Sequence, residues 1–486
     1  MPSGSGGGYE AGPYEAASVK AGSFRPGSFR ADWLSQFGGG ERGDASPTFT
    51  QADHLAPLKI AIVALVAMVL LGPLMTIEDG LAAGEGSVAR QIGYLMILAL
   101  TIYAVRPVAR GASWIAFPWP VLVAFAWCWI SLSWALDPGV AVRRVFLTTL
   151  VGWMAFSLVR HGGYQLSAQI LRYALLASVL ISYLFVFIDP SVGIHPASEA
   201  GNSLTGDMWR GFLGHKNFAG AVAALCVVMF TFDAKQVRRT VRIFAIVASV
   251  YFLWRSQSKT SAGMLVLALM GGAVFEFVNR RLRAYLIPLM TIGAALILYL
   301  LTAYKDVLQA DLTSPKAFTG RGHIWSTLLS YASEHPLGAG FGSFWNIEAG
   351  SPVFQYGQGF VTTIFVGHSG YLDQLVTVGL PGVLLMVFAM AVWPLARLLV
   401  SEQAPKGQGA LISAMLMFCI GHNTTETGMF ERDAIVSTIF FFAVAFAHYA
   451  TLGERRTVKK DAGDAVMREL RQRTRRSARP VVTAGK

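Results

Sequence analysis

Residues 371–397 read YLDQLVTVGLPGVLLMVFAMAVWPLAR, and the 23 consecutive positions between Asp373 and Arg397 carry no charge. A helix that crosses the hydrocarbon core of a bilayer needs about 20 mostly apolar residues. This stretch therefore predicts a membrane-spanning helix. The Gly-Leu-Pro-Gly run at 379–382 predicts a break with close packing inside that helix.

Apolar stretches of similar length recur along the chain. Hydrophobic residues make up 54% of the 486 residues and charged residues only 14%, well below the roughly 25% of a soluble globular protein. We therefore predict an all-α polytopic membrane protein with about 12 transmembrane helices. The other predicted spans are 58–77, 91–107, 114–135, 145–160, 167–188, 217–233, 242–256, 260–278, 284–303, 408–422 and 433–452.

The spans divide the chain into three predicted parts. Residues 1–55 are Gly-rich, lack the apolar core of a signal peptide and are expected to form a disordered cytoplasmic tail. Residues 56–453 are expected to form the transmembrane domain, and 454–486 a basic cytoplasmic tail on anionic lipid. All three cysteines lie inside apolar runs and are expected to be buried thiols: Cys128, Cys226 and Cys419.

The distribution of basic residues predicts the orientation of the spans. The chain has 40 Lys and Arg against 28 Asp and Glu, a formal net charge of +12. With a cytoplasmic N-terminus, 29 basic residues fall on the cytoplasmic side and 11 on the other. The loops 233–242 and 280–283 alone give this orientation by the positive-inside rule, so both termini are expected in the cytoplasm. Because the basic excess follows topology, nucleic-acid binding has little support.

Loop lengths differ between the two predicted sides. The internal cytoplasmic loops are short and no GxxxxGK[ST] motif is present, so an ATP-driven reaction is not expected. The outer side has two long loops, 189–216 and 304–368. We expect an amphipathic helix in the second loop, either along the outer membrane face above a cavity or packed on the helix bundle. Its apolar face is predicted from Trp325, Leu328, Leu329 and Ala332.

Basic residues on the outer side oppose the positive-inside tendency and are candidates for function. A single outer cation more often snorkels or faces solvent. Five of these cations come from three separate outer loops, and their convergence would suit an anionic headgroup such as a diphosphate. The five are Arg210, Lys216, Arg255, Lys259 and Arg321.

Short motifs surround these residues: WRGFLGHKNFAG at 209–220, SQSKTS at 256–261, TGRGHIW at 319–325, PLGAGFGSFW at 336–345, His368-Ser369 with Gly379-Leu-Pro-Gly382 after nine residues, and NTTE at 423–426. In this order they resemble blocks of the bacterial O-antigen ligase and polysaccharide polymerase superfamily, most closely its exopolysaccharide polymerases. The resemblance covers roughly 137–432. Ser369 departs from the Asn that the family usually has after the histidine.

The resemblance implies glycosyl transfer on the periplasmic face of a bacterial inner membrane, without a metal or other cofactor. The donor would be a saccharide linked through diphosphate to a polyprenyl lipid, so the activated bond arrives with the substrate. Arg210 and Arg321 are then the first choices for stabilising the departing diphosphate, supported by Lys216, Lys259 and Arg255. The implied partners are this lipid-linked oligosaccharide, membrane lipid, and polysaccharide assembly or export proteins.

His368 is the candidate general base, because imidazole titrates near neutral pH and the acceptor hydroxyl must lose a proton. His215 is expected to bind sugar or to cap a helix, and Glu426 to orient His368 or an arginine, or to be solvated. The supporting residues of the candidate site are His215, Asn217, Glu426, Ser369 and Tyr371. Tyr371, Trp325 and Trp345 are expected either to stack on sugar rings or to anchor the chain at the interface.

Three functions follow from these features. A polymerase would join lipid-linked repeat units, whereas an O-antigen ligase would move finished glycan onto lipid A core with the same donor chemistry. A transporter of lipid-linked glycan would require ionisable residues near the bilayer midplane. The candidate residues lie at predicted outer helix ends instead, which favours an enzyme.

Overall fold

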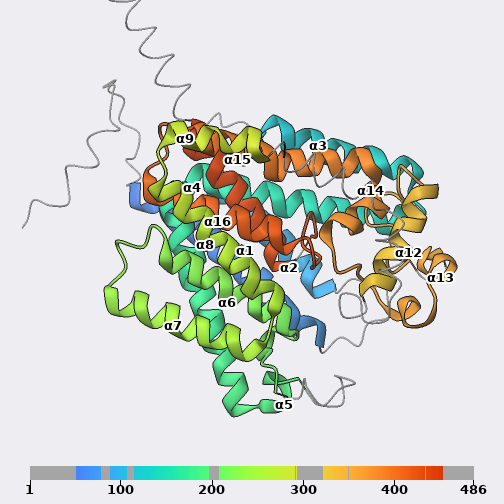
Figure 1. Ribbon diagram of the computed structural model, residues 1–486, viewed down its shortest axis with the longest axis horizontal. Coiled ribbons are helices and arrows are strands. Elements are labelled where there is room, and N and C mark those ends of the chain that lie inside the picture. The colour runs from blue at the N-terminus through green and yellow to red at the C-terminus, as the bar shows by residue number, and fades with distance from the viewer. Residues whose placement is uncertain are drawn as a thin grey trace, which may run out of the picture. The chain divides into compact units, whose positions relative to one another are not determined.

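The computed structural model describes residues 51–77, 88–106, 114–195, 207–290, 292, 321–347, 350–432 and 434–452 (Figure 1). All of them belong to one compact unit, Gln51–Lys486. The described residues form helices and connecting loops without a β-strand, which confirms the predicted all-α class. Most of the predicted span 284–303, the first part of the loop 304–368 and nearly all of both tails lie outside the described residues.

Helices occupy the predicted apolar segments. Among the described residues, six helices are long and apolar enough to cross a membrane, and two shorter apolar helices accompany them. This supports a polytopic membrane protein, while the number of 12 spans and their orientation stay predictions. The helices of these segments are α1 (Gln51–Ile77), α2 (Val88–Val105), α3 (Trp119–Ile130), α4 (Pro138–Ile188), α6 (Lys216–Thr231), α7 (Arg239–Ser256), α8 (Lys259–Phe277), α14 (Gly370–Val387), α15 (Trp393–Val400), α16 (Lys406–His422) and an unlabelled helix, Ile435–Leu452.

Two of these helices are not simple rods. The predicted spans 145–160 and 167–188 are the two halves of α4, which join at Gly163, where φ is 78°. A left-handed φ suits glycine because it has no Cβ to clash with the backbone. The single predicted span 371–397 comprises α14, a π-helical turn at Phe388–Val392 and α15.

Large apolar side chains on the surface of the helices agree with a membrane protein. Ile92 on α2, Val247 on α7 and Val266 on α8 are 50%, 62% and 57% exposed. Extensive apolar surface of this kind is rare on soluble monomers. Contact with lipid would remove it from water.

Helix α6 is buried along nearly its whole length, from Ala219 to Phe230. It packs against α4, α7, α8 and α16. Glycines allow the neighbouring helices α8 and α16 to approach closely, because a Cβ on Gly409 would overlap the ring of Phe275. The three cysteines are free and buried, as predicted.

The break predicted at Gly379 is confirmed and depends on a second glycine. Gly379 has a φ of 71°, and a Cβ there would collide with the carbonyl oxygen of Pro336. Gly338 has a φ of 73°, and a Cβ there would lie 2.7 Å from the nitrogen of Gly379. The break leaves backbone groups of α14 without partners in the helix, and the 336–339 segment supplies them. Ala339 N–H donates to the Val376 carbonyl at 2.8 Å, and Leu380 N–H donates to the Pro336 carbonyl at 3.1 Å.

The predicted amphipathic helix is present as α12 (Arg321–Glu334), which packs against α14. This contact agrees with the interpretation of a helix packed on the bundle. The predicted apolar face is confirmed in part, because Leu328 is buried and Trp325 and Ala332 pack against the same buried cluster. Ile324, Leu328 and Tyr331 are buried, whereas Leu329 is 43% exposed. Residues 324, 328 and 331 share a face by the same i, i+4, i+7 spacing, and the tyrosine belongs to the apolar side.

We expect Gly379→Ala to lower the thermal unfolding temperature of the detergent-purified protein. The substitution forces an L residue into a left-handed conformation, which costs of order 1–3 kcal/mol, and adds the collision with Pro336. Gly263→Ala is the matched control, because Gly263 lies in α8 with nothing within 4 Å of its Cβ position. An unchanged unfolding temperature for Gly379→Ala would contradict this account of the break.

Candidate active site

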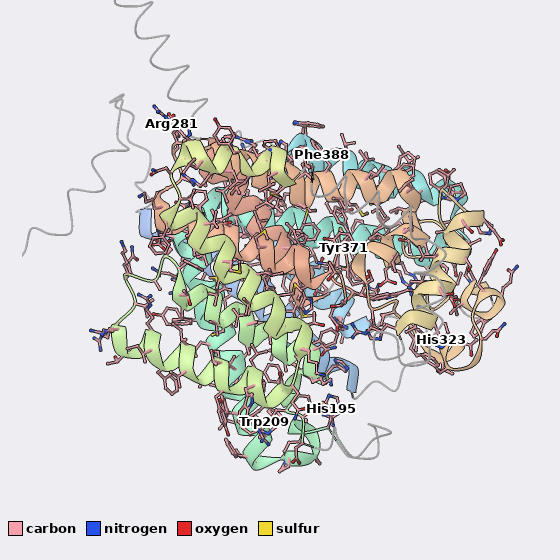
Figure 2. The ribbon with its side chains drawn as sticks, viewed as in Figure 1. His195, Trp209, Arg281, His323, Tyr371 and Phe388 are labelled. Carbon is pink, nitrogen blue, oxygen red and sulfur yellow. The ribbon has the colours of Figure 1, made fainter. Side chains whose placement is uncertain are left out.

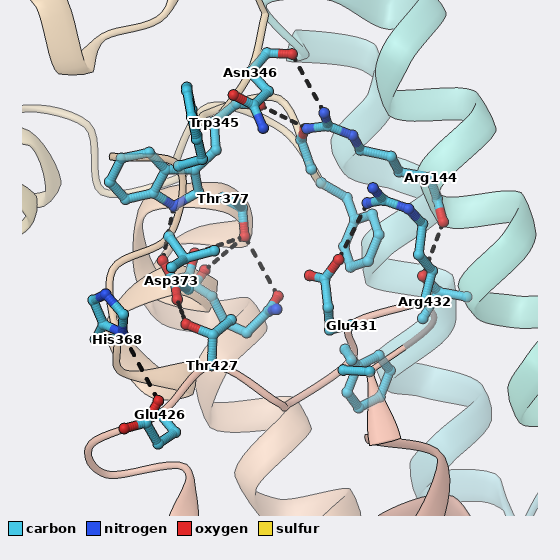
Figure 3. A pocket seen from close by; sticks show the side chains of 18 of the residues that line it. Arg144, Trp345, Asn346, His368, Asp373, Thr377, Glu426, Thr427, Glu431 and Arg432 are labelled. Carbon is cyan, nitrogen blue, oxygen red and sulfur yellow. Dashed lines mark hydrogen bonds and ion pairs between the residues drawn. The ribbon is translucent and has the colours of Figure 1, made fainter. Parts of the chain in front are cut away.

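Segments predicted on the outer side meet around a cavity of about 510 Å³ (Figure 3). Its lining comes from the start of α2, the start of α4, the turn before α6, the loop 341–346, the segment 365–368, the first turns of α14 and the segment 426–435. Four sequence-predicted residues line it, namely His215, Trp345, His368 and Glu426, whereas Arg321, Lys216 and Lys259 are not part of its lining.

Glu426 connects the predicted residues of this site. Its side chain is 4% exposed, and its Oε1 accepts from Arg321 Nη2 at 2.7 Å and from Asn217 Nδ2 at 2.6 Å. Its Oε2 lies 3.8 Å from His368 Nδ1. The predicted alternative of a solvated acid is therefore wrong. Burial raises the pKa of Glu426, but His368 and Arg321 lower it by more, so the net effect is a pKa below the ordinary value.

The spacing of Asn217 and Gly220 explains how α6 reaches Glu426. One helical turn separates Asn217 from Gly220, so both residues face α8. A Cβ on Gly220 would lie 2.5 Å from Ser258 Cβ, and only glycine permits this approach. Ser258 Oγ then donates to Asn217 Oδ1 at 3.2 Å and orients the amide so that its nitrogen donates to Glu426.

His368 has a φ of 51° and stands directly before α14. Ser369 is the N-cap of that helix, with its hydroxyl facing the Leu372 N–H at 3.5 Å. Ser and Asn are both favoured N-caps, so the departure from the family's usual residue preserves this local role. Gly370 N–H donates to the carbonyls of Asn423 at 2.9 Å and Glu426 at 3.1 Å, which holds His368 beside Glu426.

Asp373 is a site residue that the sequence analysis missed. It is buried and accepts from Gly367 N–H at 2.9 Å, from Trp345 Nε1 at 2.8 Å and from the Thr427 hydroxyl. Gly367 precedes His368 and Thr427 follows Glu426, so one carboxylate positions both neighbours. The sequence could have indicated Asp373, because an acidic residue inside a predicted membrane span is by default a candidate functional residue.

The five predicted cations do not all converge. Arg321 pairs with Glu426, and Lys216 lies within electrostatic range of Arg321, Lys259 and Glu426. Burial lowers the pKa of Lys216, which stands just before the predicted span 217–233. The positive charges of Lys259 and Arg321 lower it further, whereas Glu426 raises it. Arg321 and Lys216 therefore belong to one electrostatic group with Glu426, in which Arg321 makes the ion pair.

The prediction that Arg210 and Arg255 join this cluster is wrong, because both guanidinium groups contact other parts of the protein. Arg210 donates to the backbone carbonyls of Val192 at 2.9 Å and Ser191 at 3.0 Å, and the guanidinium of Arg255 lies 5.0 Å from the ring of Trp209. Neither residue lines the cavity. In Figure 2, Trp209 lies well away from His323 at the start of α12. Sequence adjacency to the HKN block did not reveal that Arg210 contacts the 191–192 backbone and Arg255 the ring of Trp209.

Of the two roles predicted for His215, the structure shows the helix cap, and sugar binding stays a prediction. Its Nδ1 accepts from the Asn217 N–H at 3.2 Å as the N-cap of α6, and its ring also lines the cavity. Burial lowers the pKa of His215 to about 4, so its imidazole is neutral at physiological pH. His215 therefore offers the cavity a neutral polar group.

The predicted aromatic residues have mainly structural contacts. Tyr371 donates its hydroxyl to the Ile420 carbonyl at 2.8 Å and packs in the core, which contradicts its place among the supporting site residues. Trp325 Nε1 donates to the Gly367 carbonyl at 3.0 Å. Only Trp345 lines the cavity, with its indole nitrogen bonded to Asp373.

Three arginines that the sequence analysis counted among the outer cations but did not select also line the cavity: Arg90, Arg144 and Arg432. Arg144 and Arg432 lie side by side, across the cavity from His368 and Glu426 (Figure 3). Arg144 donates to the backbone carbonyls of Gly342, Trp345 and Asn346. Arg432 pairs with Glu431 at 3.1 Å.

Within the described ranges, no three His, Cys, Asp or Glu side chains gather closely enough to hold a metal ion. The sequence matches no model of a known protein family and no curated protein.

Glu426→Gln tests the electrostatics of the site. Because the folded-state pKa of Glu426 lies below its ordinary value of 4.5, the ionised carboxylate stabilises the folded protein above about pH 4.5, and this contribution is lost as the pH falls through the folded-state value. We therefore expect the stability difference between pH 7 and pH 4 to be smaller in Glu426→Gln than in the wild type, measured by chemical denaturation. Glu334→Gln, an exposed carboxyl outside the cavity, is the control and should retain the wild-type difference.

Proposed function

We propose that this protein is a membrane glycosyltransferase that extends a polysaccharide by joining units carried on polyprenyl diphosphate. The observation that carries the proposal is the His368–Glu426–Arg321 arrangement at a cavity bounded by predicted outer segments. It combines a candidate base, an orienting carboxylate and a cation, the groups that transfer from a diphosphate donor requires. The motif resemblance points to the same chemistry.

In this reaction an acceptor hydroxyl oxygen attacks the anomeric carbon of the donor sugar. The new carbon–oxygen bond forms as the bond to the diphosphate breaks, and the electron pair leaves with the polyprenyl diphosphate. The hydroxyl proton moves to His368 and from there to water. The ionised Glu426 facing Nδ1 favours the tautomer protonated there, which leaves the Nε2 lone pair for the hydroxyl.

The leaving diphosphate needs fixed positive charge as the bond breaks. Arg321 supplies a positive charge that is paired with Glu426, and Lys216, on which Lys259, Arg321 and Glu426 all act, adds a second one nearby. Arg321 is the first choice for this contact, with the two lysines in support. Arg210 is assigned a positioning role through the carbonyls of Ser191 and Val192 rather than direct contact with the diphosphate.

An O-antigen ligase is the second candidate, because it shares the donor and differs only in the acceptor. Transport of lipid-linked glycan has less support. The ionisable groups of the cavity gather where predicted outer segments meet instead of along a path through the helices.

His368→Ala and Arg321→Gln are expected to abolish most glycosyl transfer by the purified protein with a lipid-linked oligosaccharide. Loss of a general base typically lowers the rate about 10²–10⁴-fold, and loss of a cation that stabilises developing charge about 10²–10³-fold. Release of polyprenyl diphosphate and product length give the measurement. His323→Ala is the matched control, because His323 lies two residues after Arg321 in α12 and its ring faces Phe360, with 6.4 Å between the ring centroids. Wild-type rates in both site variants would refute the assignment.

A strain that lacks the protein separates the two candidate enzymes. Single repeat units without high-molecular-weight polymer are expected for a polymerase, because only chain extension is lost. Long polymer that persists on the carrier lipid and is absent from lipid A core would identify a ligase instead. Gel analysis of the glycan length gives the readout.

A further inference from the structure

A second cavity lies at the opposite end of α12 from Arg321. It has a volume of about 870 Å³ and is bounded by residues 134–136, by the end of α12 with the segment 334–338, and by the segment 350–355, which includes most of α13 (Val353–Tyr356). We call it the outer cleft, because all three segments are predicted on the outer side. Figure 1 shows α13 beside α12, and the two helices pack against each other.

The charge of the outer cleft differs from that of the proposed donor site. Among the described residues that line it there is one acid, Glu334, and no lysine or arginine. Phosphate groups and other anions are bound mainly by positively charged donors. The outer cleft therefore favours a neutral ligand over a diphosphate.

Apolar side chains form part of the lining. Phe354 and Leu337 are 55% and 46% exposed. Trp134 also lines the cleft, and its ring is fixed because Nε1 donates to the Leu337 carbonyl at 3.1 Å and the indole packs edge-on against Trp127 with 5.8 Å between the ring centroids. A ring held in this way offers apolar contact area at a low cost in side-chain entropy.

A chain of hydrogen bonds fixes the polar side of the cleft. The Tyr356 hydroxyl donates to Glu334 Oε2 at 2.6 Å and lies 3.2 Å from His335 Nε2, which can donate to it. The His335 ring also packs against Tyr331, with 4.5 Å between the ring centroids. A carboxylate accepts more than one hydrogen bond, so Glu334 can accept others from the hydroxyl groups of a ligand.

We infer that the outer cleft binds neutral sugar units of a lipid-linked substrate, remote from the bond that reacts. This inference rests on the proposed function. A pyranose ring carries hydroxyl groups at its edge and C–H groups on its faces. The hydroxyl groups match Glu334, and the C–H faces match the rings of Trp134 and Phe354.

Helix α12 sets the distance between the two sites. Arg321 begins the helix beside Glu426, and Glu334 ends it at the outer cleft. With a rise of 1.5 Å per residue, the two ends lie about 20 Å apart. A monosaccharide is much shorter than this distance, so only a glycan of several sugar units can occupy both sites.

Binding of free oligosaccharides to the full-length protein in detergent tests the inference without requiring catalysis. The probes are oligosaccharides released by partial acid hydrolysis from the polysaccharide of the cells that make the protein, separated by length. We expect the long oligosaccharides to bind the wild type. Phe354→Ala should weaken this binding about tenfold through the loss of an aromatic contact, and Phe354→Trp should retain it. Glu334→Gln should also weaken it, because a carboxylate accepts stronger hydrogen bonds than an amide.

Phe360→Ala is the matched control for Phe354→Ala. Phe360 belongs to the same predicted outer loop, is 50% exposed and lines neither the outer cleft nor the cavity beside His368. Its replacement should leave the affinity for oligosaccharides at the wild-type value.

Kinetics of glycosyl transfer assign the outer cleft to remote sugar units. In Phe354→Ala the KM for a lipid-linked substrate with a long glycan should rise about tenfold. The KM for a substrate with a single repeat unit should not change, and neither should kcat, because the contact is the same in the ground state and the transition state.

Absence of oligosaccharide binding by the wild type, or wild-type affinity in both Phe354→Ala and Glu334→Gln, would overturn the inference. An equal rise in KM for short and long substrates would also overturn it, because the cleft would then not act on remote units. If Phe354→Ala does not fold, Glu334→Gln provides the test. Failure of the proposed function has a different signature, since wild-type protein would then transfer no glycan whatever its affinity for free oligosaccharides.

Discussion

A carboxylate buried away from water must be compensated by charge and hydrogen bonds, and the packing around Glu426 follows from this requirement. Its partners come from three elements distant in sequence: Arg321 opens α12, Asn217 opens α6 and His368 precedes α14. Each partner is itself held by further contacts, as Ser258 holds Asn217. The contacts that compensate the charge of Glu426 therefore hold the starts of these helices together and form the polar side of the cavity.

The sequence predicted those features that depend on local periodicity or on a single strong residue preference. Uncharged runs predicted the helices, and the glycines at 379–382 predicted the break in α14. The HKN and TGR blocks led to Asn217 and Arg321, which the fold brings to the same carboxylate. The predicted face of α12 included the exposed Leu329 and left out Ile324 and Tyr331, which are buried.

Features that depend on long-range pairing could not be predicted from local patterns. Asp373 lies within a predicted span, and only the folded chain shows that its partners are Gly367, Trp345 and Thr427. Arg144 and Arg432 lie 288 positions apart and became neighbours through folding. Arg210 lies six residues before Lys216, yet its guanidinium donates to the backbone carbonyl of Val192. Position in the chain indicated which side these residues occupy, but not which partners they have.

The contact between Gly338 and Gly379 also limits how the sequence can change. A side chain at either position would meet the backbone of the other segment, so neither position can diversify while the opposite segment keeps its path. Because α12 leads into the first segment and α14 carries the second, the constraint extends to the helix that begins with Arg321 and the helix that follows His368. In related chains, a larger residue at either glycine would therefore mark a rearranged site, whatever the surrounding motifs retain.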